Sequence, residues 1–193
     1  MEAILVSTGV VALAEMGDKT QLLAFILAAR FKRPLPIILG ILFATLLNHG
    51  LAGALGTWIT TVVSQDVLRW VLGLSFIGMA IWTLIPDKLE EEETKIASKL
   101  GVFGATFITF FLAEMGDKTQ IATIALAAHY AAPVMVIAGT TLGMLIADVP
   151  AVFIGNKFAE KIPMKLVHLI AAGIFALMGV LTLFRLDKLI SWG

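Results

Sequence analysis

The stretch Leu13–Gln21 has the sequence LAEMGDKTQ, and it recurs without a change 99 positions later, at Leu112–Gln120. The same offset aligns Pro34 with Pro133, so the similarity extends beyond the motif itself. An identical motif with aligned flanking positions indicates that the chain consists of two copies of one unit. This internal repeat and the composition of the chain together indicate the fold class.

The composition is typical of a membrane protein. Of the 193 residues, 59% are hydrophobic and 15% are charged, and the mean hydropathy is +0.96; a soluble domain has about 25% charged residues. Lysine plus arginine equals aspartate plus glutamate at 14 each, so no basic surface is available for nucleic acid. The absence of cysteine excludes thiolate metal sites and cysteine nucleophiles. We therefore predict an integral membrane protein.

Apolar stretches separated by short polar breaks predict six membrane-spanning helices, and the lack of strict alternation argues against strands. The expected spans are residues 3–29, 35–58, 67–85, 102–128, 133–158 and 167–184. Each copy then contains three spans, and an odd number makes the second copy enter the membrane upside down. We predict an all-α polytopic fold of two inverted three-helix repeats, residues 1–89 and 100–193, joined by an acidic cytoplasmic linker at residues 90–99.

The loop charges predict the orientation of the chain, because cytoplasmic loops carry an excess of lysine and arginine. Nine such residues fall on one side of the predicted membrane and three on the other. The first side is then cytoplasmic, and both termini face outward, with the bacterial inner (plasma) membrane as the expected location. The nine are Arg30, Lys32, Arg33, Lys88, Lys95, Lys99, Lys157, Lys161 and Lys165, and the three are Arg69, Arg185 and Lys188.

Each copy of the motif places ionisable residues in the middle of an apolar run, where an isolated charge costs about 2.5–3.5 kcal/mol. Glu15 and Asp18 are three residues apart, so on a continuous helix both carboxylates share one face. Lys19 follows Glu15 by four residues, which is the favourable order for an ion pair within a helix. Gln21 lies at the edge of the same face. These ionisable residues are candidates for function, because an isolated charge is unfavourable inside the membrane.

Thr20 points away from Glu15 on an ideal helix, so its hydroxyl can join the acids only if the helix unwinds at Gly17. Glycine in this place permits either a local break or close packing of two helices. The same expectations hold for the second copy of the motif. Its corresponding residues are Glu114, Gly116, Asp117, Lys118, Thr119 and Gln120.

Inverted symmetry predicts that the two motifs face each other, and their charges then sum to −2. Four carboxylates contribute −4 and two lysines contribute +2. One divalent cation or two protons would neutralise this charge, which suggests an exchange of metal for protons. Carboxylate, amide and hydroxyl oxygens suit Mg²⁺, Ca²⁺ or Mn²⁺ rather than Zn²⁺ or Cu⁺. The lysines have two interpretations, as counter-ions that hold the acids or as proton carriers.

Two further polar residues at membrane depth are candidates for the metal path. Asn48 lies in the second span and offers an amide oxygen, although a hydrogen bond between helices is the alternative role. Asp148 lies in the fifth span, where the repeat aligns it with His49. A buried acid at this depth must contact water, pair with a cation or carry a proton.

The hexapeptide Glu-Met-Gly-Asp-Lys-Thr, present twice, resembles the E-x-G-D-[KR]-[ST] signature of a cation–proton exchanger family. That family includes bacterial manganese exporters of the MneA type and the Golgi and chloroplast manganese/calcium transporters of eukaryotes. The resemblance covers the whole chain and implies export of Mn²⁺, or Ca²⁺ in some members, against protons. By this resemblance, the metal and proton sites are Glu15, Asp18, Glu114 and Asp117. It implies no prosthetic group, the metal being the transported substrate.

Two other functions could also use acids inside the membrane. A passive divalent-cation channel could use the same acids, and proton coupling would distinguish it from an exchanger. An intramembrane aspartyl protease would need a Gly-x-Gly-Asp motif, whereas here the motif begins with glutamate and each aspartate is followed by lysine, so we expect no enzyme. The preferred metal, the proton stoichiometry, the number of metal sites and the formation of a homodimer in the lipid bilayer stay open.

Overall fold

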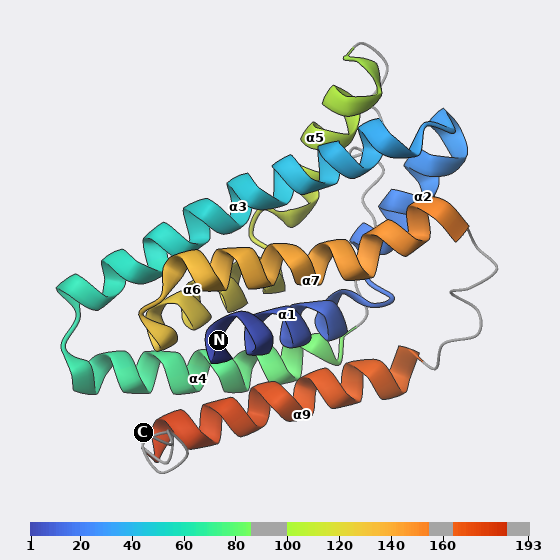
Figure 1. Cartoon of the computed structure of the whole chain (residues 1–193). Helices are drawn as coiled ribbons and strands as arrows, with labels where there is room; N and C mark the ends of the chain where they lie inside the picture. Colours follow the sequence, from blue (N-terminus) through green and yellow to red (C-terminus); the bar gives the residue numbers. More distant parts are fainter. Residues whose placement is uncertain (86–99, 155–163, 185–193) are drawn as a thin grey trace.

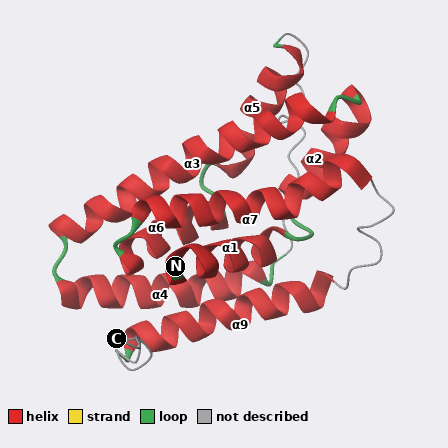
Figure 2. Ribbon diagram, in the orientation of Figure 1, coloured by secondary structure: helices red, strands yellow, loops and turns green. Residues whose placement is uncertain are grey.

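The computed structural model describes residues 1–85, 100–154 and 164–184, and within these ranges all regular elements are helices (Figures 1 and 2). The prediction of an all-α chain is confirmed for this part. The predicted linker at residues 90–99 and most of the loop lysines used for orientation lie outside the described residues. The helices are α1 (Glu2–Glu15), α2 (Lys19–Phe31), α3 (Pro34–Val62), α4 (Gln65–Thr83), α5 (Gly101–Glu114), α6 (Lys118–Tyr130), α7 (Pro133–Ile154) and α9 (Met164–Leu183).

Two of the predicted spans are each divided into two helices. Residues 3–29 form α1 and α2, and residues 102–128 form α5 and α6, with a break inside each copy of the motif. The break is sharp because Gly17 and Gly116 have φ angles of 81° and 78°, a left-handed conformation that only glycine adopts without strain. Of the two roles that the sequence permits for this glycine, a local break and close helix packing, the structure shows the break; hydropathy does not detect this local backbone geometry.

Tight turns connect the second helix of each pair to a long helix. Lys32 and Ala131 take up left-handed conformations, with φ of 51° and 50°, just after α2 and α6. Pro34 and Pro133 then begin α3 and α7. Proline lacks a backbone N–H, but in the first turn of a helix this group has no acceptor within the helix. These short connections keep α2 and α6 close to the long helices that follow them.

Small residues let the helices of the two copies approach closely. Helix α1 packs against α7, and α5 packs against α3. A Cβ atom at Gly139 of α7 would lie 2.6 Å from the carbonyl oxygen of Ile4, and one at Gly40 of α3 would lie 2.6 Å from Cβ of Thr106. Neither interface has room for a side chain at these glycines. This packing places the two helix breaks side by side in the centre of the molecule.

Corresponding helices of the two copies run in opposite directions. In Figure 1, α3 runs from right to left and α7 from left to right, and the neighbouring helices α4 and α9 are likewise opposed. Three described helices are long and apolar enough to cross a membrane: Pro34–Val62, Gln65–Thr83 and residues 133–153 of α7. Their outer faces expose large apolar side chains, as lipid requires; examples are Phe43, Leu51, Trp70 and Phe153. The full six-span arrangement stays a prediction.

Candidate functional site

The two helix breaks place their acids at helix ends. Helices α1 and α5 end at Glu15 and Glu114, while Asp18 and Asp117 are the N-caps of α2 and α6. Asp18 Oδ1 accepts a hydrogen bond of 2.8 Å from the backbone N–H of Lys19. The N-terminal ends of α2 and α6 favour the aspartates, and the C-terminal ends of α1 and α5 present carbonyl groups that favour a cation.

Each break is spanned by a hydrogen bond from a threonine to a glutamate. Thr20 Oγ1 donates to Glu15 Oε2 at 2.7 Å, and Thr119 Oγ1 donates to Glu114 Oε2 at 2.8 Å. All four side chains are buried. Thr20 reaches Glu15 because residues 16–18 are not helical. This contact was expected only if the helix unwinds at Gly17.

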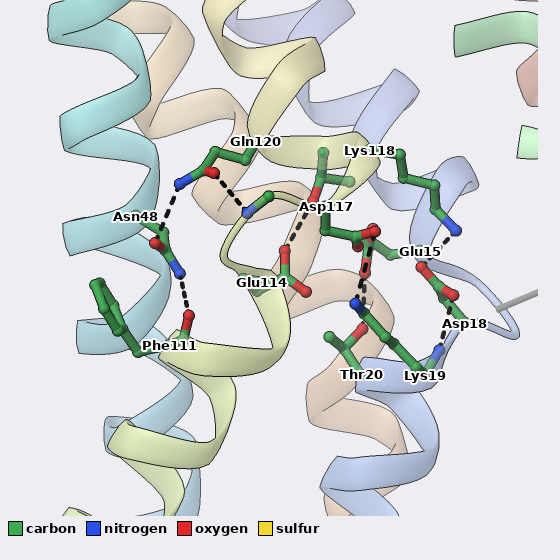
Figure 3. Close-up of polar contacts among 12 residues, drawn as sticks. Glu15, Asp18, Lys19, Thr20, Asn48, Phe111, Glu114, Asp117, Lys118 and Gln120 are labelled. Atoms are coloured by element: carbon green, nitrogen blue, oxygen red, sulfur yellow. Dashed lines mark hydrogen bonds and ion pairs between the residues drawn. The ribbon is translucent and has the colours of Figure 1, made fainter. Parts of the chain in front are cut away.

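The lysines form ion pairs between the two motifs (Figure 3). Lys118 Nζ lies 2.5 Å from Asp18 Oδ2, and Lys19 Nζ lies 3.7 Å from Asp117 Oδ1. Sequence spacing instead predicted a pair between Lys19 and Glu15 on one helix. That argument does not apply, since the break removes the helical geometry that four-residue spacing requires. The two motifs are thus held together by each other's charges.

Three carboxylates gather where the breaks meet. One carboxylate oxygen from each of Glu15, Glu114 and Asp117 lies within 4.8 Å of the other two, and all three residues are buried. Glu15 Oε1 and Glu114 Oε1 accept no hydrogen bond from the described part of the chain. Oxygen ligands lie about 2.3–2.6 Å from a Ca²⁺ ion, so opposite ligands are about 5 Å apart. The cluster therefore has the spacing of a divalent-ion site, and its charge needs a cation or protons.

The glutamine of each motif folds back onto its own break. The backbone N–H of Gly17 donates to Gln21 Oε1 at 3.0 Å, and that of Gly116 donates to Gln120 Oε1 at 2.8 Å. These bonds partner a backbone donor that the broken helix leaves unbonded. They also show that the amide oxygens of both glutamines face the glycines of the breaks.

Asn48 of α3 contacts the second motif through both atoms of its amide. Its Oδ1 accepts a bond of 3.3 Å from Gln120 Nε2, and its Nδ2 donates to the carbonyl oxygen of Phe111 at 3.0 Å (Figure 3). At the corresponding place in the other copy, Gln21 Nε2 donates to the carbonyl oxygen of Ala147 at 2.9 Å. Asn48 thus makes hydrogen bonds from α3 to α5 and α6, the alternative role to metal binding that its sequence position suggested.

Asp148 and His49 are buried beside this region, on α7 and α3. Among the residues that the structure describes, neither ring nitrogen of His49 has a hydrogen-bond partner, and the side chain of Asp148 lies near Thr20. Asp148 lies within electrostatic range of Asp18 and Glu114 but is not one of the three clustered carboxylates. The sequence did not point to the carbonyl groups of Phe111 and Ala147, because backbone atoms leave no residue-type signal.

One family model and several relatives match most of the chain. The family model described as "Divalent cation/proton antiporter GDT1" matches residues 3–91 and 102–188. The chain is 54% identical, over 95% of its length and 92% of the relative, to a Vibrio cholerae protein named "Putative manganese exporter". It is 35% identical, over 89% of its length and 92% of the relative, to a GDT1-like protein of Synechocystis. GDT1-like protein 3 of Oryza sativa is 30% identical over 90% of this chain and 71% of its own length. No solved structure matches this chain.

Proposed function

We propose, since this chain belongs to the GDT1 family of divalent cation/proton antiporters, that it exports Mn²⁺ from the cytoplasm in exchange for protons. Family membership makes the chain a transporter and not an enzyme, so the interpretation as an aspartyl protease is discarded. The observation that carries the proposal is the cluster of Glu15, Glu114 and Asp117, whose buried carboxylates have the spacing of divalent-ion ligands.

We assign the transported metal to the four motif acids, which are Glu15, Asp18, Glu114 and Asp117. Thr20 and Thr119 orient the two glutamates, and Lys19 and Lys118 are the counter-ions of the two aspartates. The other polar side chains expected at the site surround the cluster, and they are Gln21, Gln120, Asn48 and Asp148.

Charge balance explains how the metal and the protons are coupled. The four acids and two lysines sum to −2, which one Mn²⁺ or two protons neutralise. A site with an uncompensated charge of −2 resists enclosure in a medium of low dielectric constant. Only the metal-loaded or the protonated site therefore closes and reopens on the other side. Because the same oxygens hold either ligand, arrival of protons outside displaces the metal.

The preference for Mn²⁺ rests on two supports. The donor atoms of the motif acids are hard oxygens, which suit Mn²⁺ and Ca²⁺. The Vibrio cholerae relative carries the name of a manganese exporter and shares 54% of the aligned residues. Ca²⁺ is the second cation to test, since both ions accept carboxylate ligands.

We further propose that residues 1–89 and 100–193 are inverted repeats that move against each other around the site. The opposite directions of α3 and α7 support this arrangement, as does the pairing of each aspartate with a lysine of the other copy. In this scheme both termini lie outside the cytoplasm, and the loop charges support that orientation.

The experiment that tests this function uses purified protein in liposomes, with a metal-sensitive dye on one side and a pH-sensitive dye on the other. Mn²⁺, Ca²⁺ and Mg²⁺ are added in turn, with and without a proton gradient. We expect Mn²⁺ flux that drives an opposing proton flux. The variant Glu114→Gln should lose both fluxes, whereas Glu2→Gln, at an exposed acid far from the breaks in sequence, should keep them.

The outcomes separate the alternatives. Metal flux that is indifferent to the proton gradient would indicate a channel and contradict the exchange. Normal Mn²⁺ export by Glu114→Gln would contradict the site assignment. A flux larger for Ca²⁺ than for Mn²⁺ would keep the exchange and change its substrate.

A further inference from the structure

The two glutamines of the motifs make equivalent pairs of hydrogen bonds, but their second partners differ. Each accepts from the glycine N–H of its own break and donates to a long helix of the other copy. The acceptors belong to residues 48 and 147, which are 99 positions apart like the motifs themselves. At position 147 the acceptor is the backbone oxygen of alanine, whereas at position 48 it is the side-chain oxygen of asparagine.

Asn48 adds a contact that its counterpart cannot make. Its Nδ2 donates to the carbonyl oxygen of Phe111, in the last turn of α5, while its Oδ1 holds Gln120 at the start of α6. One side chain of α3 therefore fixes the helices on both sides of the second break. Ala147 has no polar side chain, so the corresponding bond of Gln21 fixes only α2.

This arrangement connects the amides of Asn48 and Gln120 to the backbone next to Asp117. Gly116, which precedes Asp117, is held by Gln120, and Gln120 is held by Asn48. Asp117 is one of the three clustered carboxylates. A shift of the break would therefore move a carboxylate out of the cluster, even though neither amide is a member of it.

Resting on the proposed function, we propose that Asn48 and Gln120 are positioning residues: they fix the second break on α3 and thereby hold Asp117 in reach of the metal. In this role Asn48 acts on the metal through Asp117, with both atoms of its amide used in contacts to protein groups. Gln21 has the same role for the first break, with an acceptor that no side-chain substitution removes.

A double-mutant cycle tests this proposal. The variants are Asn48→Leu, Gln120→Met and their combination, which replace the amides by apolar groups of similar size. Loss of a buried hydrogen bond changes an equilibrium constant about tenfold. We expect each single variant to raise the Mn²⁺ concentration for half-maximal binding about tenfold and the combination to raise it by about the same factor, since both break one connection.

The matched control pairs Asn48→Leu with Gln21→Met, which belong to different breaks. Their effects on Mn²⁺ binding should multiply to about a hundredfold. A ligand role for Asn48 predicts instead that its loss multiplies with the loss of Gln120, and that result would overturn the proposal. The ratio of Mn²⁺ to Ca²⁺ affinity should not change in Asn48→Leu, because the set of ligands is unchanged.

Hydrogen exchange of the metal-free protein gives a readout that does not depend on transport. In Asn48→Leu and Gln120→Met, the backbone amides of residues 115–118 should exchange faster, while those of residues 16–19 stay as in the wild type. Gln21→Met should show the reverse, and size-exclusion profiles confirm that the variants are folded. Unchanged exchange at residues 115–118 in Asn48→Leu would refute the positioning role, whereas absence of metal flux in the wild type would refute only the proposed function.

Discussion

Lys118 and Asp18 form a salt bridge of 2.5 Å between the second and the first motif, and both side chains are only 1% exposed. The reciprocal pair, Lys19 with Asp117, is longer at 3.7 Å, and Lys19 is 17% exposed. The site is therefore asymmetric. Asp18 is engaged with a lysine, whereas Asp117 belongs to the carboxylate cluster together with the two glutamates.

The two lysines should differ in their contribution to stability. Lys118→Met leaves Asp18 as a buried charge without its partner, which lowers the free energy of unfolding by about 3–5 kcal/mol. Lys19→Met removes a longer and partly exposed pair, and the loss should be about 1 kcal/mol or less. Unfolding of both variants in detergent, followed by circular dichroism, measures the difference. Equal losses would contradict the asymmetry, and Lys118→Arg should recover most of the stability because it restores the charge.

The hydroxyl groups that span the breaks should be needed for metal binding. Thr20→Val keeps the shape of the side chain but removes the bond to Glu15, and a hydrogen bond to a charged group is worth about 1.5–3 kcal/mol. Mn²⁺ affinity, measured by titration calorimetry, should fall about tenfold or more. Thr20→Ser should retain it. Thr182→Val, which removes only a bond to the backbone of its own helix, is the control and should bind Mn²⁺ normally.

The left-handed glycines should be sensitive to substitution for a reason that involves the backbone alone. A Cβ atom at Gly116 would meet none of the described residues within 4 Å, so Gly116→Ala introduces no clash with them. It places an L-residue in the left-handed region, which costs about 1–2 kcal/mol. We expect a lower melting temperature and slower exchange of Mn²⁺ for protons in liposomes. Gly9→Ala, within α1 and equally free of neighbours, should be neutral or stabilising; the same loss in both variants would show that the left-handed conformation is not the cause.

Mn²⁺ binding should weaken as the pH falls. Metal and protons compete for the same carboxylates, so more of the site is protonated at lower pH and less is available to the metal. If two protons leave per metal, the dissociation constant rises up to a hundredfold for each pH unit. Titrations between pH 6 and pH 8 measure this slope. Glu114→Gln should reduce the slope, and a constant that does not vary with pH would contradict proton exchange.

The sequence predicted the helical elements well where apolar runs are uninterrupted. The spans expected at residues 35–58 and 67–85 are the single helices α3 and α4, displaced by a few residues at their ends. The spans that contain the motifs are each broken at the motif glycine, which the sequence permits but hydropathy does not detect, because hydropathy averages over the break at Gly17. A glycine followed by an aspartate N-cap is a stop and start signal for helices, and the dependence of Thr20 on unwinding pointed to it.

The sequence predicted which residues lie near one another better than it predicted the contacts that these residues make. Three of the motif acids lie together where the two breaks meet, as the repeat suggested, and the threonines join the glutamates because each helix is unwound at its glycine. The partner of Lys19 was not found, since four-residue spacing has meaning only on an unbroken helix. The role of Asn48 depends on two atoms of other helices, Gln120 Nε2 and the carbonyl oxygen of Phe111, and no local pattern reveals such a contact.

The ion pairs between the motifs also affect how the protein is made. The ribosome completes Asp18 and Lys19 before it reaches Asp117 and Lys118, 99 residues later. At about 5–20 residues per second, the first motif waits about 5–20 seconds for its partner. During this interval its charges have no counterpart from the second copy. We therefore expect the first two helices to stay with the insertion machinery, or at the membrane surface, until the second motif arrives and supplies the partners of these charges.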